Sequence, residues 1–304
     1  MKANRLGWVL IFFLGSAVLQ LPAQQSEADG KLLADVRAKA EKGDAVAQYN
    51  LGNCYGQGQG VDRDYVEAVK WFRKAAEQNH AQAQYNVGFC YWSGRGVAKD
   101  EVEAVKWFRQ AAEQNDAQAQ NNVGFCYWSG QGVAKDYTEA VKWYRKAAEQ
   151  NYARAQYNLG TCYGQGQGVA KDVAEAVKWF RKSAEQNYAQ AQFGLGICYH
   201  EGEGVTKDEA EAVTWFRKAA EQNYAEAQFN LGACYCNGDG VTKDYVEAYK
   251  WFILASAQGH ENAKAAKDSL TQQMTPEQIA KGFRLAREFK PSSAPESGAF
   301  ASPR

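Results

Sequence analysis

Apolar residues along most of this chain follow the spacing of an amphipathic α-helix, in pairs of segments separated by glycine-rich stretches. In the first segment, Ala47, Leu51 and Cys54 fall at i, i+4 and i+7, which places them on one helix face. The stretch GQGQGV then interrupts the pattern, because glycines supply the backbone conformations of a tight loop. A second amphipathic segment begins at Asp64 and places Phe72 on its apolar face. The pattern predicts two antiparallel helices.

This pair of segments recurs with a period of 36 residues. The recurring tryptophans are Trp71, Trp107, Trp143, Trp179, Trp215 and Trp251. The recurring cysteines are Cys54, Cys90, Cys126, Cys162, Cys198 and Cys234, and the recurring glycines are Gly52, Gly88, Gly124, Gly160, Gly196 and Gly232. A fixed period of this length is typical of a solenoid of stacked units. We therefore predict an all-α fold, a right-handed superhelical solenoid of antiparallel helix pairs.

Each second helix carries a start signal and a stop signal. An aspartate is followed three residues later by a glutamate, as in Asp64 and Glu67, which is the spacing of a capping box. The stop signal is an asparagine or glycine that tolerates the left-handed conformation of a helix C-terminus. These residues are Gly43, Asn79, Asn115, Asn151, Asn187, Asn223 and Gly259.

The period also sets the predicted boundaries. Six repeats occupy residues 44–79, 80–115, 116–151, 152–187, 188–223 and 224–259. Because terminal repeats need their apolar faces covered, we predict an N-terminal capping helix in 24–43 and C-terminal capping helices in 260–290. In the latter, Thr275 is the predicted N-cap and Pro276 the first helical residue. The composition of 291–304 predicts a disordered tail.

The N-terminus has the pattern of an export signal. Lys2 and Arg5 precede the apolar run LGWVLIFFLGSAVL, and Ala23 offers a small residue for cleavage. The run is shorter than the ~20 residues that span a bilayer. We expect residues 1–23 to be a cleaved signal peptide, and the exported chain to be periplasmic or extracellular without stable membrane insertion. The alternative is an uncleaved anchor.

The charge balance bears on the class of partner. The chain has 35 basic and 35 acidic residues, so its net charge creates no long-range attraction for nucleic acid. We expect no nucleic-acid partner.

The unit AQYNLGNCYGQGQGVDRDYVEAVKWFRKAAEQN resembles a Sel-1-like repeat, a relative of the tetratricopeptide repeat with a longer, glycine-rich loop between its helices. The resemblance covers about residues 31–290. Members of the family are mostly adaptors that hold other proteins together, so the resemblance implies an adaptor. Some exported relatives carry two cysteines per repeat that bridge the helices, and some have been linked to β-lactam hydrolysis. This chain departs from them, with one aligned cysteine per repeat.

The aligned cysteines allow three interpretations. Disulfides along the row are disfavoured, because equivalent residues of packed helices lie ~8–10 Å apart whereas a disulfide needs Cα atoms within ~7 Å. A metal site at Cys234 and Cys236 has only a weak signal, since residues at i and i+2 diverge on a helix. The third interpretation is a small apolar residue that fills a slot between helices. We expect buried, unreactive thiols, an exposed Cys236, and no metal or cofactor.

Catalytic motifs are missing from the sequence. It contains no Ser-x-x-Lys, Gly-x-Ser-x-Gly, His-Glu-x-x-His or phosphate-loop pattern. The histidines His80, His200 and His260 occupy three different positions of the repeat, and capping accounts for the periodic acidic residues. We predict no catalytic residues and no enzyme activity. The alternative is a hydrolase of the cysteine-rich type, acting on β-lactam or cell-wall substrates.

If the solenoid binds a partner, the predicted face is the concave one formed by the first helices. An asparagine row lies there, at Asn50, Asn86, Asn122, Asn158 and Asn230, interrupted by Gly194. Each asparagine amide can both donate to and accept from the backbone of an extended peptide. The alternative is that these amides tie the helix to an adjacent loop.

Aromatic pairs distinguish two neighbouring repeats. Phe89 and Trp92 lie at i and i+3 and share a helix face, as do Phe125 and Trp128, while the other repeats carry smaller residues. Clustered aromatic residues on a surface favour binding hot spots. The alternative is that they pack into a neighbouring loop. We therefore predict an exported adaptor for an unidentified protein or peptide; a purely structural array is the remaining alternative.

Overall fold

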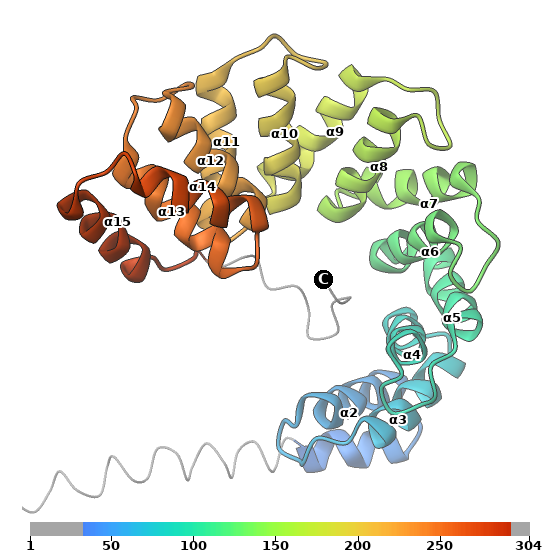
Figure 1. Ribbon diagram of the computed structural model, residues 1–304. Helices are drawn as coiled ribbons and strands as arrows, with labels where there is room; N and C mark the ends of the chain where they lie inside the picture. The colour runs from blue at the N-terminus through green and yellow to red at the C-terminus, as the bar shows by residue number, and fades with distance from the viewer. Residues whose placement is uncertain (1–32, 293–304) are drawn as a thin grey trace, which may run out of the picture. The chain divides into compact units, whose positions relative to one another are not determined.

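The computed structural model describes residues 33–292, and every regular element in this range is a helix (Figure 1). The chain divides into an N-terminal unit that ends at Gln114 and a C-terminal unit that begins at Asn115. The predicted signal peptide at 1–23 lies outside the described residues. No helix between residues 33 and 292 combines the length and apolar character that a membrane span requires.

The N-terminal unit contains two helix pairs. They follow a helical segment at residues 33–41, within the predicted capping helix. The helices are α2 (Ala45–Gln57), α3 (Tyr65–Glu77), α4 (Ala81–Ser93) and α5 (Glu101–Glu113).

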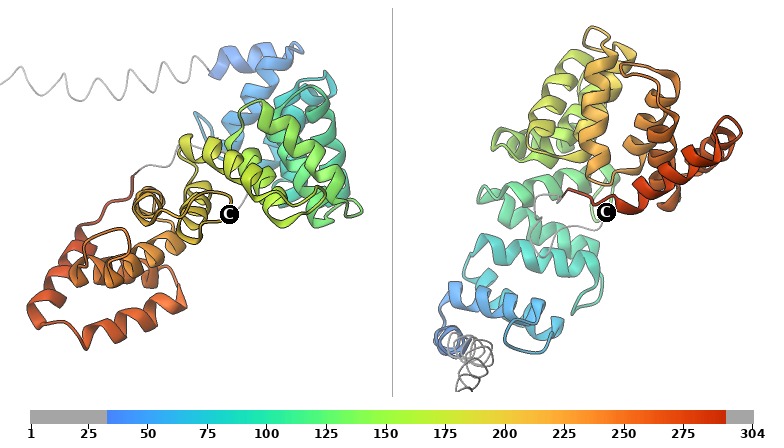
Figure 2. Two further views of the ribbon diagram at one scale, coloured as in Figure 1. Left: turned by 90° about the horizontal axis from the view of Figure 1, so that it is seen from above. Right: turned by 90° about the vertical axis from the view of Figure 1, so that its left-hand side faces the viewer.

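The C-terminal unit contains four further pairs and two closing helices. The pairs are α6 (Ala117–Ser129) with α7 (Tyr137–Glu149), α8 (Ala153–Gln165) with α9 (Val173–Glu185), α10 (Ala189–Glu201) with α11 (Glu209–Glu221), and α12 (Ala225–Asn237) with α13 (Tyr245–Ala257). The closing helices are α14 (Glu261–Thr271) and α15 (Pro276–Glu288), and both pack on α13 (Figure 2). Consecutive helices pack within each unit as a repeat solenoid, as predicted. Below, the first helices are α2, α4, α6, α8, α10 and α12, and the second helices are α3, α5, α7, α9, α11 and α13.

The periodic glycine allows the two helices of a repeat to approach closely. A Cβ atom on Gly196 would lie 2.6 Å from the ring of Phe216, and one on Gly52 would lie 2.6 Å from the ring of Phe72. These distances are too short for any side chain larger than hydrogen, so the recurring glycine is a packing requirement.

The helix termini follow the predicted signals, with one difference. Asp64 accepts hydrogen bonds from the backbone N–H groups of Val66 and Glu67, and the other periodic aspartates cap their helices in the same way. The glutamate, however, does not complete the box: Glu67 Oε2 accepts instead from Lys70 Nζ at 2.8 Å. Both halves of a capping box are present at Thr275, which confirms this residue as an N-cap.

The asparagines at the ends of the second helices adopt the left-handed conformation, as predicted, with φ between 64° and 70°. Gly43 and Gly259 take the same role at φ 95° and 88°. This conformation turns the chain toward the next first helix.

The C-terminal end continues beyond α15. The Phe289 ring packs edge-on against Trp251 with centroids 5.6 Å apart, and Ser292 N–H donates to Glu221 O at 2.8 Å. The first two residues of the predicted tail therefore run beside α11, and residues 293–304 lie outside the described range.

Candidate binding surface

A row of buried glutamine side chains connects neighbouring repeats, and the sequence reasoning missed it. Each first helix carries one glutamine that is at most 5% exposed: Gln48, Gln84, Gln120, Gln156, Gln192 and Gln228. In the fourth repeat, Gln156 Nε2 donates to Ala148 O at 3.2 Å and to Asn151 Oδ1 at 3.0 Å, both in the preceding repeat. A buried amide that is satisfied in this way fixes the register of its neighbours.

A second glutamine extends this network to the end of the repeat's own second helix. Gln186 Nε2 donates to Gln156 Oε1 at 2.7 Å, and Gln222 repeats the contact to Gln192 at 2.7 Å. We call the two sets of glutamines together the amide ladder. The amide ladder holds the first helices at fixed positions within each unit. The opposite face of these helices takes no part in the ladder.

An arginine–tyrosine contact adds a further link between repeats. Arg181 Nη2 donates to Tyr199 OH at 2.7 Å, and Arg217 Nη2 donates to Tyr235 OH at 2.7 Å. In each case a second helix reaches the first helix of the following repeat. The scaffold contacts are thus repeated almost without change along the chain.

The predicted asparagine row does not form a uniform open surface. Asn50 is exposed, Asn122 is half-buried, and Asn86 is only 5% exposed. Asn158 Nδ2 donates to Asn121 Oδ1 of the preceding repeat at 2.9 Å, and Asn230 Nδ2 donates back to Glu226 O of its own helix at 2.8 Å. The contacts of Asn158 and Asn230 are therefore made within the solenoid.

The first aromatic pair, in the N-terminal unit, differs from the predicted exposed patch. Phe89 is only 1% exposed and lies under the guanidinium of Arg95, 5.6 Å from the ring centroid. Trp92 is half-buried, with its ring 6.4 Å from that of Phe108. The i, i+3 spacing placed these residues on one face correctly but could not show what covers Phe89.

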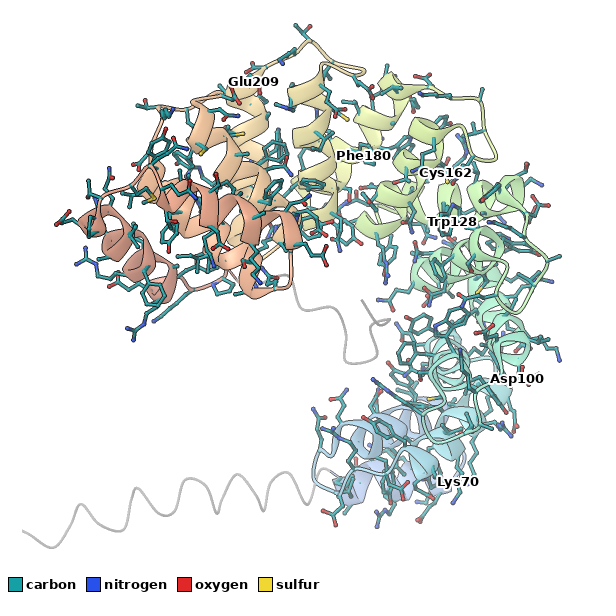
Figure 3. All side chains as sticks on the ribbon, in the orientation of Figure 1. Lys70, Asp100, Trp128, Cys162, Phe180 and Glu209 are labelled. Carbon is teal, nitrogen blue, oxygen red and sulfur yellow. The ribbon has the colours of Figure 1, made fainter. Side chains whose placement is uncertain are left out.

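The second pair, in the C-terminal unit, is more open. Phe125 is 37% exposed and stacks on Trp128 with centroids 6.2 Å apart. Trp128, which is labelled in Figure 3, is half-buried, and its indole N–H donates to Gln167 Oε1 at 2.8 Å in the loop between α8 and α9. Trp128 therefore packs against a neighbouring loop, which was the alternative interpretation. Phe125 stacks on the Trp128 ring and stays exposed.

The first helices of the last three repeats begin with tyrosines. Tyr152, Tyr188 and Tyr224 occupy the N-cap positions of α8, α10 and α12 and make no side-chain capping hydrogen bond. Two of these rings pack on the preceding first helix: Tyr188 lies 5.6 Å from Tyr157, and Tyr224 lies 5.4 Å from Phe193, between ring centroids. These repeats have an aromatic lining where others have a polar cap.

The aligned thiols are mostly buried, which confirms the structural interpretation. Cys90, Cys126, Cys162, Cys198 and Cys234 are buried, and none of the seven cysteines forms a disulfide. Burial raises the pKa of Cys90 to about 12 and that of Cys162 to about 11. Cys54 and Cys236 are only half-buried, so Cys236 is more accessible than five of the aligned thiols, and Cys54 is an unpredicted exception.

The histidines and acidic residues have structural contacts. His80 Nδ1 accepts a hydrogen bond from Ala83 N–H at the start of α4, at 3.2 Å. His260 Nδ1 accepts one from Ala263 N–H at the start of α14, also at 3.2 Å. His200 Nδ1 lies 2.6 Å from Glu209 Oε2. Within residues 33–292, no group of three or more His, Cys, Asp or Glu side chains is arranged to hold a metal ion.

One cavity of about 470 Å³ lies between α11, α12 and the start of α13. Its charged lining residues have partners: Arg217 donates to Tyr235, and Lys250 Nζ lies 3.2 Å from Glu247 Oε2. None of the candidate binding residues predicted from the sequence lines this cavity.

Comparisons with known proteins agree with this geometry. The Sel1 repeat profile matches residues 45–80, 81–116, 117–152, 153–188, 189–224 and 225–260. A protective antigen of uropathogenic Escherichia coli that displays an SLR fold is 36% identical with a TM-score of 0.75; the match covers 84% of this chain and 56% of the antigen. This chain therefore spans little more than half of the antigen's length. A Sel1 repeat protein from Oxalobacter formigenes is 40% identical with a TM-score of 0.68, covering 71% and 89% of the two chains.

No curated protein sequence matched the chain. The six matched windows each start one residue after the boundaries expected from the period, and together they run from residue 45 to residue 260. Because they account for well over half of the 304 residues, the chain belongs to the Sel1 repeat family.

Proposed function

We propose that this protein is an exported adaptor that binds an extended segment of a partner protein along the first helices of its C-terminal unit. The Sel1 fold typically mediates interactions between proteins, which supports the general class. The first helices α6, α8, α10 and α12 form one face, which supports the location. Each contacts the next through a pair of side chains: Asn121 with Asn158, Tyr157 with Tyr188, and Phe193 with Tyr224.

One observation carries the proposal. The residues that join the repeats are nearly invariant along the chain, as the amide ladder shows, whereas the face of the first helices changes from repeat to repeat. At one position of that face, Phe125 is followed in the next three repeats by Thr161, Ile197 and Ala233. Recognition of a particular partner requires a surface whose side chains differ from one repeat to the next.

Hydrolysis of β-lactam or cell-wall substrates has no support in the described residues. The periodic aspartates cap helices, and His80, His200 and His260 are engaged in caps or in a pair with Glu209. Five of the six aligned cysteines are buried, where a substrate cannot reach them.

Site-specific photocrosslinking in the native host tests the location. A photoreactive phenylalanine would replace Asn122 or Gln190 on the first helices, and matched controls would carry it at Lys142 or Lys178 on the second helices, where both lysines are exposed. We expect discrete protein adducts from the first-helix positions only. Equal adducts from both sets, or none from either, would contradict the proposal.

Cell fractionation tests the export. We expect the chain in the periplasm or the medium at a mass that lacks residues 1–23. A full-length chain in the cytoplasm would contradict this part of the proposal.

A further inference from the structure

Gly194 is a helix-interior glycine that local packing does not require. It lies in α10 at the position where other first helices carry Asn50, Asn86, Asn122, Asn158 and Asn230. A Cβ atom there would meet nothing nearer than the Phe180 ring at 3.9 Å, an ordinary contact. A glycine inside a helix lowers its stability, so its retention at an unobstructed position needs another reason.

The missing side chain uncovers an aromatic ring. Phe180 is half-buried, whereas its counterparts in the other repeats are at most 3% exposed. Those counterparts are Phe72, Phe108, Tyr144, Phe216 and Phe252. The centroid of the Tyr157 ring lies 5.7 Å from that of Phe180, and the Tyr188 ring lies 5.6 Å from that of Tyr157. Gly194 thus leaves the Phe180 ring partly exposed beside Tyr157 and Tyr188, and we call these four residues the Phe180 notch.

A unique cation lies beside this notch. Arg154 is the only lysine or arginine in the six first helices, where its counterparts are Val46, Gln82, Gln118, Gln190 and Glu226. It is half-buried and forms no ion pair with any carboxylate among residues 33–292. Its charge acts on Tyr188, where it offsets part of the rise in pKa that burial causes. Arg154 and Tyr157 lie at i and i+3 of α8 and so share the helix face that borders the notch, and the guanidinium is available to an anion.

A third departure from the repeat pattern supports Arg154. Ser183 stands where the other repeats have alanine, and it is fully buried. Its Oγ donates to Ala153 O at 2.7 Å, which joins α9 to the first turn of α8 immediately before Arg154. Three exceptional residues of the array, Arg154, Ser183 and Gly194, therefore converge on one place.

We propose that Arg154 and the Phe180 notch bind an aspartate or glutamate side chain and a neighbouring apolar side chain of an extended partner segment. The guanidinium can hold the carboxylate with two parallel hydrogen bonds, and the notch receives the apolar residue. This inference rests on the proposed adaptor function and defines the chemistry of the partner.

Local charge favours a single carboxylate over a phosphate group. Arg154 is the only lysine or arginine of the first helices, and acidic residues stand at the starts of two other first helices: Asp116 caps α6, and Glu226 lies in the first turn of α12. A dianion would meet one positive charge between two negative ones. A carboxylate, with one negative charge, matches the site.

Peptide display followed by binding measurements tests the inference. Random dodecapeptides displayed on phage would be selected on the purified chain, and selected sequences would be synthesised with acetylated and amidated ends. We expect an acidic residue next to an apolar residue in these peptides. Arg154→Gln and Gly194→Asn each restore a residue found in other repeats, and each should weaken binding about 10-fold or more. Lys178→Gln, with the same charge change on a second helix, should have no effect.

A paired substitution separates this inference from the proposed function. Changing the peptide's acidic residue to its amide should weaken binding to the unchanged protein but not further weaken binding to the Arg154→Gln variant. Selected peptides that lack the acidic residue, or whose binding ignores Arg154→Gln, would overturn the inference and leave the adaptor function standing. Failure to select any peptide would contradict both. Circular dichroism and thermal melts establish that each variant is folded.

Discussion

Gln186 Nε2 donates a hydrogen bond to Gln156 Oε1 at 2.7 Å and so joins the end of α9 to the buried face of α8. Gln156 donates in turn to Ala148 O and Asn151 Oδ1, at the end of α7. Since Gln156 is 2% exposed, water cannot replace these contacts. One side chain therefore connects three consecutive helices, and its counterparts do the same along each unit.

Replacing Gln156 by alanine should lower the free energy of unfolding by about 2–4 kcal/mol, because it removes three buried hydrogen bonds that join α7, α8 and α9. Urea unfolding followed by circular dichroism measures the change. Gln165→Ala, at an exposed position of the same helix, is the matched control and should have little effect. Equal stabilities of the two variants would show that the amide ladder does not stabilise the array.

The fold was predictable because its signals are local. The aspartates at helix starts and the left-handed asparagines act within a few residues, and the period multiplied these signals sixfold. The amide ladder was missed because glutamine is usually read as a surface residue. The recurrence of Gln48 and its counterparts on the apolar face was the available signal. The burial of Phe89 under Arg95 and the exposure of Phe180 beside Gly194 depend on contacts with neighbouring segments. The spacing of residues within one helix does not predict such contacts.

The fifth repeat offers a test of how the tryptophans are buried. Trp215 Nε1 donates to Glu211 Oε1 at 2.8 Å, whereas the indole N–H groups of the five other periodic tryptophans are buried without an acceptor. The difference has a local cause. In the other repeats the glutamate pairs with a lysine three residues on, as Glu139 does with Lys142, but Thr214 occupies that position here.

Thr214→Lys should therefore draw Glu211 away from Trp215. We expect a loss of about 1 kcal/mol, since a hydrogen bond to a charged group is exchanged for an exposed ion pair. The indole N–H resonance of Trp215 in a nitrogen–proton correlation spectrum should move toward those of the other tryptophans. Thr214→Gln, which cannot form the ion pair, should leave the resonance in place. An unmoved resonance in the lysine variant would refute this explanation.

Alkaline pH should destabilise the protein through its buried thiols. Burial raises the pKa of Cys90 and Cys234 to about 12, above the ordinary value of 9.0. Between these values the folded chain retains protons that the unfolded chain releases, so stability is full below pH 9 and falls as the pH rises toward 12. At pH 10 the expected loss is about 1.4 kcal/mol for each thiol.

Urea unfolding at pH 8 and pH 10 measures this dependence. Replacing both Cys90 and Cys234 by alanine should reduce the difference between the two pH values, whatever the packing change does to the stability itself. A double variant with an unaltered pH dependence would rule out these thiols as its source. At pH 8 a thiol reagent should modify Cys54 and Cys236 first, because these two are half-buried and the other five are buried.

Two glycines on the same helix should respond in opposite ways to alanine. Gly196→Ala places a methyl group 2.6 Å from the Phe216 ring and should destabilise the fold by at least ~2 kcal/mol, through overpacking between α10 and α11. Gly194→Ala places a methyl group in ordinary contact with Phe180 and should stabilise the fold by about 0.5–1 kcal/mol, because alanine is the better helix former. Thermal and urea unfolding of the two variants measure both effects. If Gly194→Ala lowered the stability as Gly196→Ala does, Gly194 would be a packing residue. Packing, and not the binding of a ligand at the Phe180 notch, would then explain the glycine.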